Sequence, residues 1–284
     1  MAATPRPGTL RSQWLGQQLR ELRDSKGILL KEAAEYLQRD TATLSRYETG
    51  FYPIRRPDLF ALLDLYGISD ASLRDKLLNL SKDVWQKGWW DGYADDVAGH
   101  LIDYIWLESR ATHIRSYAAM VVPGLLQTPD YAREVIRINE PGATSDQIDR
   151  WLELRLTRQQ ILAGDTPTRL SAVLDEAVLH RQIGDPRIME TQLRHLADRS
   201  TAASVDVRIL PFRAGTPAST NGNFSIFELP DPFPEVAYTE TLAGALYIES
   251  PENENFTRAY AGHKRQAIEP SDSINMILSA AEEW

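Results

Sequence analysis

The chain has 284 residues, a hydrophobic content of 43%, a formal net charge of -9 and no cysteine. It is longer than one typical domain and hydrophobic enough to bury a sizeable core, so two globular units are expected rather than disorder. The lack of cysteine excludes disulfides, thiolate zinc sites and thiol nucleophiles, and it fits a reducing cytoplasm.

Membrane insertion and secretion are not expected either. No apolar run approaches the ~18 residues needed to cross a bilayer, and the first ten residues lack the charged-then-apolar layout of a signal peptide. The sequence therefore predicts a cytoplasmic protein with no membrane partner.

The charge is divided unevenly about Gly88. Residues 1–87 carry 14 Lys and Arg against 11 Asp and Glu, a net +3, whereas residues 88–284 carry 17 against 29, a net -12. The overall negative charge argues against nucleic acid, because neutralised phosphates supply most of the affinity for it. The asymmetry, however, is typical of a DNA-reading head on an acidic body, and it predicts two domains, 1–87 and 88–284.

The first domain is predicted to be a bundle of five short helices. Leu15, Leu19 and Leu22 recur at helical spacing and form one apolar face of the first helix. Asp40 is the expected N-cap of the third helix, and Gly50 is its expected stop in the left-handed conformation. The predicted helices span residues 10–26, 30–37, 41–48, 58–66 and 71–87.

Residues 27–50, GILLKEAAEYLQRDTATLSRYETG, form the motif that carries chemistry. Two helices joined by a tight turn can place the second helix in the major groove, where each base pair presents a distinct hydrogen-bonding pattern. Arg46 of this second helix could donate two hydrogen bonds to guanine, worth roughly 1 to 3 kcal/mol of discrimination. The alternative is a solvated surface arginine. Arg55 and Arg56, in the loop that follows, are candidate phosphate contacts or simply exposed arginines.

This motif resembles the helix-turn-helix of the xenobiotic-response-element regulators, the repressor and Cro-like class. The resemblance implies base contacts from Thr41, Ala42 and Arg46, and phosphate contacts from Thr43 and Ser45. The shared landmarks are Gly27, Ala33-Ala34, Leu37, Leu44, the run 45–48 and Gly50.

The same resemblance pairs Glu48 with Arg23 near the end of the first helix, so Glu48 is expected in a structural ion pair rather than as a catalytic acid. Breaking such a pair costs about 3 to 5 kcal/mol if it is buried. The sequence departs from the class at Leu29 and Leu30, where relatives place a capping Thr or Ser and often a polar residue that meets phosphate. The missing cap costs about 1 kcal/mol, and Lys31 is the expected substitute phosphate contact.

The second domain reads as mixed α and β, so the expected fold class is a mainly α first domain followed by an α+β domain. We expect a small, mostly antiparallel sheet flanked by helices, with hairpin turns at residues 221–222 and 243–244. The predicted helices span residues 101–117, 129–139, 145–163, 186–200 and 252–268. The predicted strands span residues 170–174, 205–210, 224–229, 236–241 and 245–249.

A series of segments spread over most of this domain carries a second resemblance. They are KGWWDGY, VVPGLLQTPDYAREVI, LRLTRQQIL, VLDEAVLHRQIG, VRILPF, and the stretch from GNFSIFELPD to TETLAGALYIESP. In this order they look like the domain of unknown function that is fused behind such helix-turn-helix units in a large family of toxin–antitoxin-like bacterial regulators. This resemblance implies a regulator often encoded beside a small partner protein, with the large domain as the place where that partner or a ligand acts.

Two groups of residues are candidates for a ligand or partner surface in this region. Trp89 and Trp90 lie at the predicted domain junction, where tryptophans wedge two domains together or form a partner surface. Asp175, Glu176 and Arg181 combine opposite charges beside a predicted strand, and they either bind a polar ligand or form a salt bridge.

The residue sets that an enzyme needs are not convincing in this sequence. There is no glycine-rich phosphate loop and no pair of histidines at metal-binding spacing. Asp95 and Asp96 are adjacent, but neighbouring side chains point apart on a strand or a helix and do not make an acid/base pair. The sequence thus predicts no enzyme, no metal and no cofactor. The histidines stand far apart, at His100, His113, His180, His195 and His263.

Three hypotheses remain. The first is a sequence-specific transcription regulator that binds double-stranded DNA as a homodimer, since one recognition helix contacts only a few base pairs. The second is an antitoxin-like protein-interaction module with little DNA specificity of its own, favoured by the acidic body and by Leu29 and Leu30. The third is an enzyme with an unrecognised site.

Overall fold

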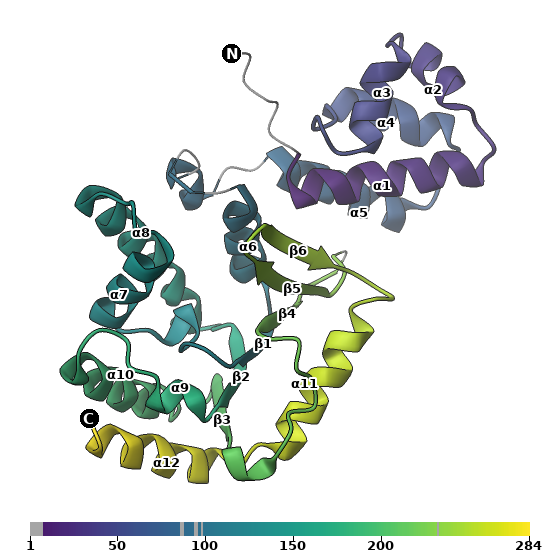
Figure 1. Cartoon of the computed structure of the whole chain (residues 1–284). Helices are drawn as coiled ribbons and strands as arrows, with labels where there is room; N and C mark the ends of the chain where they lie inside the picture. Colours follow the sequence, from purple (N-terminus) through teal and green to yellow (C-terminus); the bar gives the residue numbers. More distant parts are fainter. Residues whose placement is uncertain (1–7, 86–87, 94–95, 98, 232) are drawn as a thin grey trace. The chain divides into compact units, whose positions relative to one another are not determined.

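The computed structural model describes residues 8–85, 88–93, 96–97, 99–231 and 233–284. Contacts divide the chain into two compact units, residues 1–91 and 92–284, which Figure 1 shows in sequence colours. Residues 1–7 of the segment analysed for a signal peptide, residues 86 and 87 of the predicted fifth helix, and Asp95 lie outside the described residues. Among the described residues, no helix is both long and apolar enough to span a bilayer.

The first unit contains the five predicted helices. Thr9 caps the first of them by accepting from the backbone N–H of Ser12, and Gly27 follows it with a φ of +66°. The fourth helix starts earlier than predicted because Pro57 is accommodated in its first turn, where no N–H is needed. The helices are α1 (Leu10–Ser25), α2 (Leu30–Tyr36), α3 (Thr41–Glu48), α4 (Arg56–Leu65) and α5 (Ala71–Trp85).

The core of this unit brings α1 and α3 into close approach. Leu19 and Leu44 are completely buried. At Gly16 of α1, a Cβ atom would lie 2.4 Å from the carbonyl oxygen of Tyr47 in α3. At Gly50, with a φ of +69°, a Cβ atom would meet the backbone of Gln13 at 2.4 Å. Glycine is therefore required on both sides of this crossing.

The second unit is a sheet with helices packed against it. Its strands are β1 (His113–Ala118), β2 (Arg169–Asp175), β3 (Val205–Leu210), β4 (Phe224–Glu228), β5 (Val236–Thr241) and β6 (Gly244–Ile248). Its helices are α6 (Gly99–Arg110), α7 (Pro129–Asn139), α8 (Ser145–Arg158), α9 (Ala177–His180), α10 (Pro186–Arg199), α11 (Glu254–Gln266) and α12 (Pro270–Glu282).

The sheet is larger and more mixed than predicted. Its six strands lie in the order β3-β2-β1-β4-β5-β6, with β1, β2 and β3 parallel and the β1–β4, β4–β5 and β5–β6 pairs antiparallel. Tyr260 of α11 packs into the cluster on one face, while Tyr104 of α6 packs on Phe227 and Tyr238 on the other. The expectation of a small, mostly antiparallel sheet was wrong, because one of the central strands was not predicted.

The missing strand is β1. The predicted helix 101–117 ends at Arg110, and the chain then enters the middle of the sheet, between β2 and β4. Ile114 and Tyr117 point to opposite faces and are both buried. A strand covered on both faces shows no apolar–polar alternation, so its pattern is not distinguished from that of a helix.

Two turn predictions had different outcomes. A hairpin turn does join β5 and β6, but it consists of residues 242–243 rather than the predicted 243–244, because Gly244 already pairs with Thr241. Asn221-Gly222 does not join a hairpin: β3 and β4 flank it in sequence, but β2 and β1 separate them in the sheet. Helix α12 was not predicted, although Pro270 lies in its first turn.

Candidate nucleic-acid interface

The α2–α3 turn gives the helix-turn-helix its angle. Gln38 adopts a φ of +54°, and the backbone N–H of Arg39 donates to the carbonyl of Ala34 at 2.9 Å. Asp40 then begins α3 by accepting from the backbone N–H of Thr43 at 2.6 Å. The hydrogen bonds from Thr43 lower the pKa of the Asp40 carboxyl, so this cap is ionised and faces the positive end of the helix dipole.

Helix α3 has one anchored face and one free face. Leu44, Tyr47 and Glu48 are buried against the bundle. The candidate base-reading residues Thr41, Ala42 and Arg46 are exposed, while the candidate phosphate contacts Thr43 and Ser45 are half-buried at the borders of the exposed face. The free face thus carries small polar groups and one long cation.

The side chain of Arg46 packs on the ring of Tyr52, a contact that the sequence analysis did not predict. Its guanidinium carbon lies 5.5 Å from the centroid of the Tyr52 ring, and the backbone N–H of Tyr52 donates to the carbonyl of Arg46 at 3.2 Å. The Tyr52 ring is 47% exposed, so the pair lies at the surface. Such a contact limits the rotamers of an otherwise mobile side chain.

The C-terminal end of α3 is fixed by an ion pair. Arg23 donates from Nε and Nη2 to the two carboxylate oxygens of Glu48, and from Nη1 to the carbonyl of Ile28 at 2.9 Å. The side chains are 10% and 5% exposed. Hydrogen bonding to Glu48 is the main cause that raises the pKa of Arg23, so the guanidinium stays charged.

A second polar contact ties α3 to α4. The Tyr47 hydroxyl donates to Oδ2 of Asp58 at 3.1 Å, and Arg39 approaches the same carboxylate at 3.4 Å. Burial, followed by the hydrogen bond to Asp58, raises the pKa of Tyr47. The α2–α3 turn, α3 and α4 therefore share one buried acceptor, the Asp58 carboxylate.

The remaining phosphate candidates are exposed. Lys31 is 77% exposed and pairs loosely with Glu35 at 3.7 Å, which leaves its ammonium accessible. Arg55 lies at the start of α4, and the Arg56 guanidinium lies 5.5 Å from the Phe60 ring centroid. At the start of α2, Leu29 supplies no side-chain cap and is 65% exposed.

Half of a capping box is present at the start of α2. Oε2 of Glu32 accepts from the backbone N–H of Leu29 at 2.8 Å. Leu29 has no hydroxyl to accept from the N–H groups of the first helical turn, so the missing cap is not replaced.

The candidate surface residues near the junction and in the second unit are dispersed. Trp90 is 8% exposed and Trp89 is 42% exposed, and their rings meet edge to face. Asp175 accepts from the backbone N–H of Ala177, and Glu176 accepts from that of Phe212. The two carboxylates thus accept hydrogen bonds from the local backbone. Arg181 is exposed, and within the described residues it forms no ion pair with either carboxylate.

The second unit has a buried ion pair that sequence reasoning missed. Arg158 of α8 donates from Nε and Nη2 to Glu108 of α6 at 2.7 and 2.9 Å, with side chains 9% and 2% exposed. Burial disfavours the charged form, but the charge and hydrogen bonds of Glu108 outweigh it and raise the pKa of Arg158. Burial lowers the pKa of the neighbouring Arg155 to about 10. No local pattern links residues fifty positions apart in sequence.

A serine, a histidine and a carboxylate also meet within the sheet. Nε2 of His113 lies 2.9 Å from Oγ of Ser171, and Nδ1 lies 3.5 Å from Oε2 of Glu228. The order resembles a nucleophile–base–acid set. However, Ser171 is buried inside β2, and the outer contact has the length of an ion pair rather than of a hydrogen bond. Burial also lowers the pKa of His113. The cluster fits a structural role, in which polar contacts connect β1, β2 and β4.

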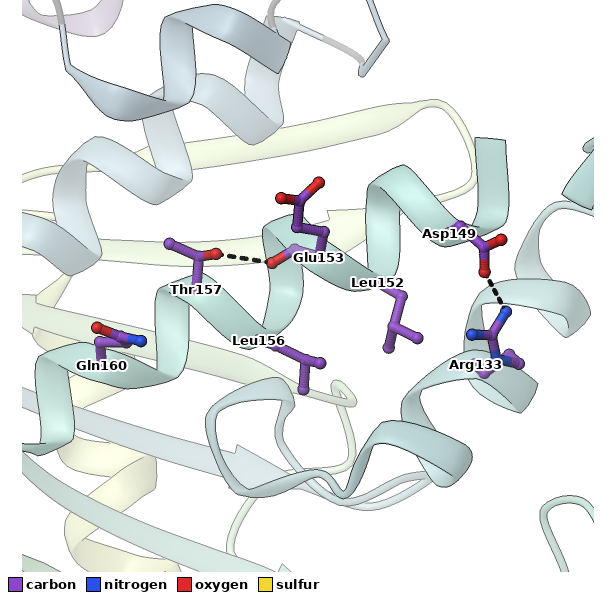
Figure 2. Close-up of a pocket in the computed structure, with 7 residues that line it drawn as sticks. All are labelled: Arg133, Asp149, Leu152, Glu153, Leu156, Thr157 and Gln160. Atoms are coloured by element: carbon purple, nitrogen blue, oxygen red, sulfur yellow. Dashed lines mark hydrogen bonds and ion pairs between the residues drawn. The ribbon is translucent and has the colours of Figure 1, made fainter. Parts of the chain in front are cut away.

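A shallow groove of about 430 Å³ runs between α7 and α8. Figure 2 shows Leu152 and Leu156 directed toward the groove, with Arg133 paired to Asp149 at one end. Leu152 and Leu156 make the floor apolar. At the rim, the charge of Arg133 is balanced by that of Asp149. This groove has room for a small apolar group but presents no unpaired cation to an anionic ligand.

Two families of known proteins match the chain. Residues 101–279 match the family described as Domain of unknown function (DUF5753), and residues 14–77 match the family described as Helix-turn-helix domain. Comparison with curated proteins and with solved structures gives no match. The helix-turn-helix match includes α2 and α3 and indicates a DNA-binding regulator.

Proposed function

The chain belongs to the family of the domain of unknown function DUF5753, and we propose that it is a sequence-specific DNA-binding transcription regulator of the repressor and Cro-like type. The observation that supports this most directly is the division of α3: Leu44, Tyr47 and Glu48 anchor the helix, while its opposite face is exposed. A helix held in this way can enter the major groove without losing its packing.

In this proposal Thr41, Ala42 and Arg46 contact base edges. Arg46 makes the contact of greatest value, because two donors directed at O6 and N7 of guanine distinguish it from the other bases. The ring of Tyr52 holds the guanidinium near its working position before DNA arrives.

The proposed phosphate contacts surround this face. Lys31, Arg55 and Arg56 are exposed cations, and Thr43 and Ser45 lie at the borders of the exposed surface of α3. These contacts would fix the register of the protein on the duplex without reading sequence.

The protein would bind as a homodimer. One recognition helix reads only a few base pairs, and two heads about one helical turn apart read a pseudo-palindrome. The second unit would respond to a ligand or to a small partner protein and so change DNA binding.

The alternative is an antitoxin-like interaction module with little independent DNA specificity. The exposed Leu29 and the carboxylate of Glu32 at the start of α2 favour it, because an apolar side chain and an acidic group there do not attract a phosphate. This alternative predicts partner binding without discrimination between DNA sequences.

Selection of bound duplexes from a random DNA library by the full-length chain separates the two proposals. A regulator enriches a pseudo-palindrome whose half-sites lie about one helical turn apart. An interaction module enriches no common sequence, even at low salt, where phosphate contacts are strongest.

A further inference from the structure

The two edge strands of the six-stranded sheet, β3 and β6, differ in how their outer backbone groups are covered. At the β3 edge, the backbone N–H of Ile209 donates to Oγ of Ser273 at 3.0 Å, and its carbonyl accepts from the N–H of Ile268 at 2.9 Å. The segment that begins α12 therefore closes this edge. β6 ends the sheet on the other side, and in the described part of the chain no strand pairs with its outer edge (Figure 1).

β6 lacks the features that usually protect an edge strand. Gly244–Ile248 contains no charged residue and no proline, and its register with β5 is continuous from Thr241↔Gly244 to Ala237↔Ile248, without a bulge. Leu246 is 55% exposed, and Leu242 at the hairpin turn is fully exposed. The strand thus offers an uncharged row of backbone donors and acceptors that no bulge interrupts.

The inner side of β6 is firmly held. The Tyr247 ring packs on Tyr238 of β5 with centroids 5.3 Å apart, and its hydroxyl donates to the carbonyl of His100 in α6. Ile248 packs against the core cluster beneath α11. A strand fixed in this way needs little reordering to accept a neighbour, which lowers the entropic cost of binding.

The surroundings of this edge are acidic. Between Arg213 and Arg258 the chain has seven Asp and Glu and no Lys, Arg or His, and β4, β5 and β6 all lie within this segment. Glu240, which pairs across from Ala245, has a side chain that is 67% exposed and lies 3.8 Å from Nε2 of His100 in α6. Glu235 is already ion-paired with Arg115 of β1, so the other carboxylates of the segment supply its excess negative charge. A second copy of the chain would bring an equally acidic segment to the edge, so charge complementarity favours a basic occupant over self-association.

We propose that the outer edge of β6 binds an extended, basic segment of a partner protein, which adds to the sheet as a further strand. Backbone hydrogen bonds to Gly244–Ile248 provide the affinity. Alternate side chains of the segment contact Leu246 on one face and the acidic groups near Glu240 on the other. This inference rests on the proposed partner-responsive role of the second unit, but it does not depend on DNA binding.

The test uses the full-length chain and a short fluorescent peptide that alternates lysine with valine. The proposal predicts saturable binding by anisotropy, with hydrogen-exchange protection centred on residues 244–248. A peptide of the same composition with prolines at alternate positions should lose binding, because proline has no N–H for the ladder. A peptide with glutamate in place of lysine should bind at least about tenfold more weakly.

Paired variants locate the charge contribution. Glu240→Lys with Glu249→Lys, the residue directly after β6, should weaken binding of the lysine peptide at least about tenfold. The matched reversal Asp165→Lys with Asp198→Lys, at exposed positions away from the β6 edge, should change it little. Circular dichroism of each variant verifies folding. Equal binding of the proline peptide, or protection outside β6, would overturn the proposal.

Light scattering tests whether a second copy of the chain, rather than a partner protein, occupies the β6 edge. A dimer that Leu246→Lys dissociates would show that a second copy occupies the edge, and it would also overturn the proposal. DNA titration of the same samples is independent: loss of peptide binding with intact DNA binding rejects only this inference.

Discussion

The guanidinium of Arg23, at the end of α1, meets the carboxylate of Glu48, at the end of α3, through two parallel hydrogen bonds of 2.7 and 2.9 Å. Both side chains are at least nine-tenths buried. The pair joins the first helix of the bundle to the proposed recognition helix, so the orientation of α3 depends on a contact far from its exposed face.

Removal of one partner of this pair should destabilise the first unit strongly. Glu48→Ala removes the buried bidentate partner of the Arg23 guanidinium and leaves it only the exposed carboxylate of Asp24, 2.6 Å from Nη1. We therefore expect a loss of about 3 kcal/mol in the free energy of unfolding, the lower end of the range for a broken buried pair. Chemical denaturation of the full-length chain measures the loss, and hydrogen exchange of peptides from α1 and α3 shows where it falls. Glu21→Ala, an exposed position on the same helix as Arg23, should change stability by less than about 0.5 kcal/mol. Equal effects of the two substitutions would show that the pair contributes little.

Gly16→Ala tests the α1–α3 crossing. Alanine in a helix interior normally stabilises by about 1 kcal/mol relative to glycine. Here the added Cβ would lie 2.4 Å from the Tyr47 carbonyl and 2.7 Å from that of Glu48, so the backbones must separate. We expect a net loss of about 1 to 3 kcal/mol, measured by thermal unfolding. Gln17→Ala, the exposed neighbour, should be neutral or stabilising, and a stabilising Gly16→Ala would contradict the close approach.

His263 should make the second unit sensitive to acid. Its side chain is completely buried and stacked on Tyr117 at 3.9 Å, and neither ring nitrogen has a hydrogen-bond partner in the described structure. Burial lowers the pKa of this imidazole, and the nearby Asp175 carboxylate opposes the effect only in part. Because the unfolded chain has the ordinary pKa of about 6.5, it binds more protons than the folded chain below that pH.

The stabilising contribution of neutral His263 is therefore present above about pH 6.5 and is lost as the pH falls toward the lower pKa of the folded state. His263→Phe keeps the stacked ring without the titration, and it should flatten the dependence of stability on pH by up to about 1.4 kcal/mol per unit in this range. Denaturation at several pH values measures the slope. Part of the pH dependence of stability should remain in this variant, because burial also lowers the pKa values of His113 and His195. An unchanged slope in the variant would contradict the buried neutral state.

The proposed phosphate contacts should affect affinity rather than specificity. Arg55→Ala and Arg56→Ala should each weaken binding to all DNA sequences alike and reduce the slope of log K against log salt by about 0.9. Titrations at several salt concentrations measure this. Arg181→Ala, an exposed arginine of the second unit, is the control. A substitution that leaves the slope unchanged identifies an arginine that does not meet the DNA.

The helices of the first unit could be predicted because their signals are local. Asp40 is a cap whose side chain reaches only three residues ahead, and Gly50 is a stop that depends on its own backbone angle. The five strands predicted in the second unit are also present, since their β-branched and aromatic runs are bounded by turns.

The rest depends on contacts between distant segments. β1 could not be distinguished from the end of a helix because both faces of the strand are covered, and its neighbours in the sheet come from residues 169–175 and 224–228. The same holds for the Glu108–Arg158 pair. The site residues on α3 came from resemblance to a known class, whereas the support of Arg46 by Tyr52 became visible only in the folded chain.

A DNA-binding titration of the full-length wild type and of Arg46→Ala, on the duplex selected by the wild type and on a scrambled duplex, tests the central proposal most directly. The account predicts tight, salt-dependent binding of the wild type to the selected duplex. It predicts a loss of roughly 1 to 3 kcal/mol for Arg46→Ala on that duplex, with little change on the scrambled one. Equal binding of the wild type to both duplexes at every salt concentration would contradict it and would favour the interaction module.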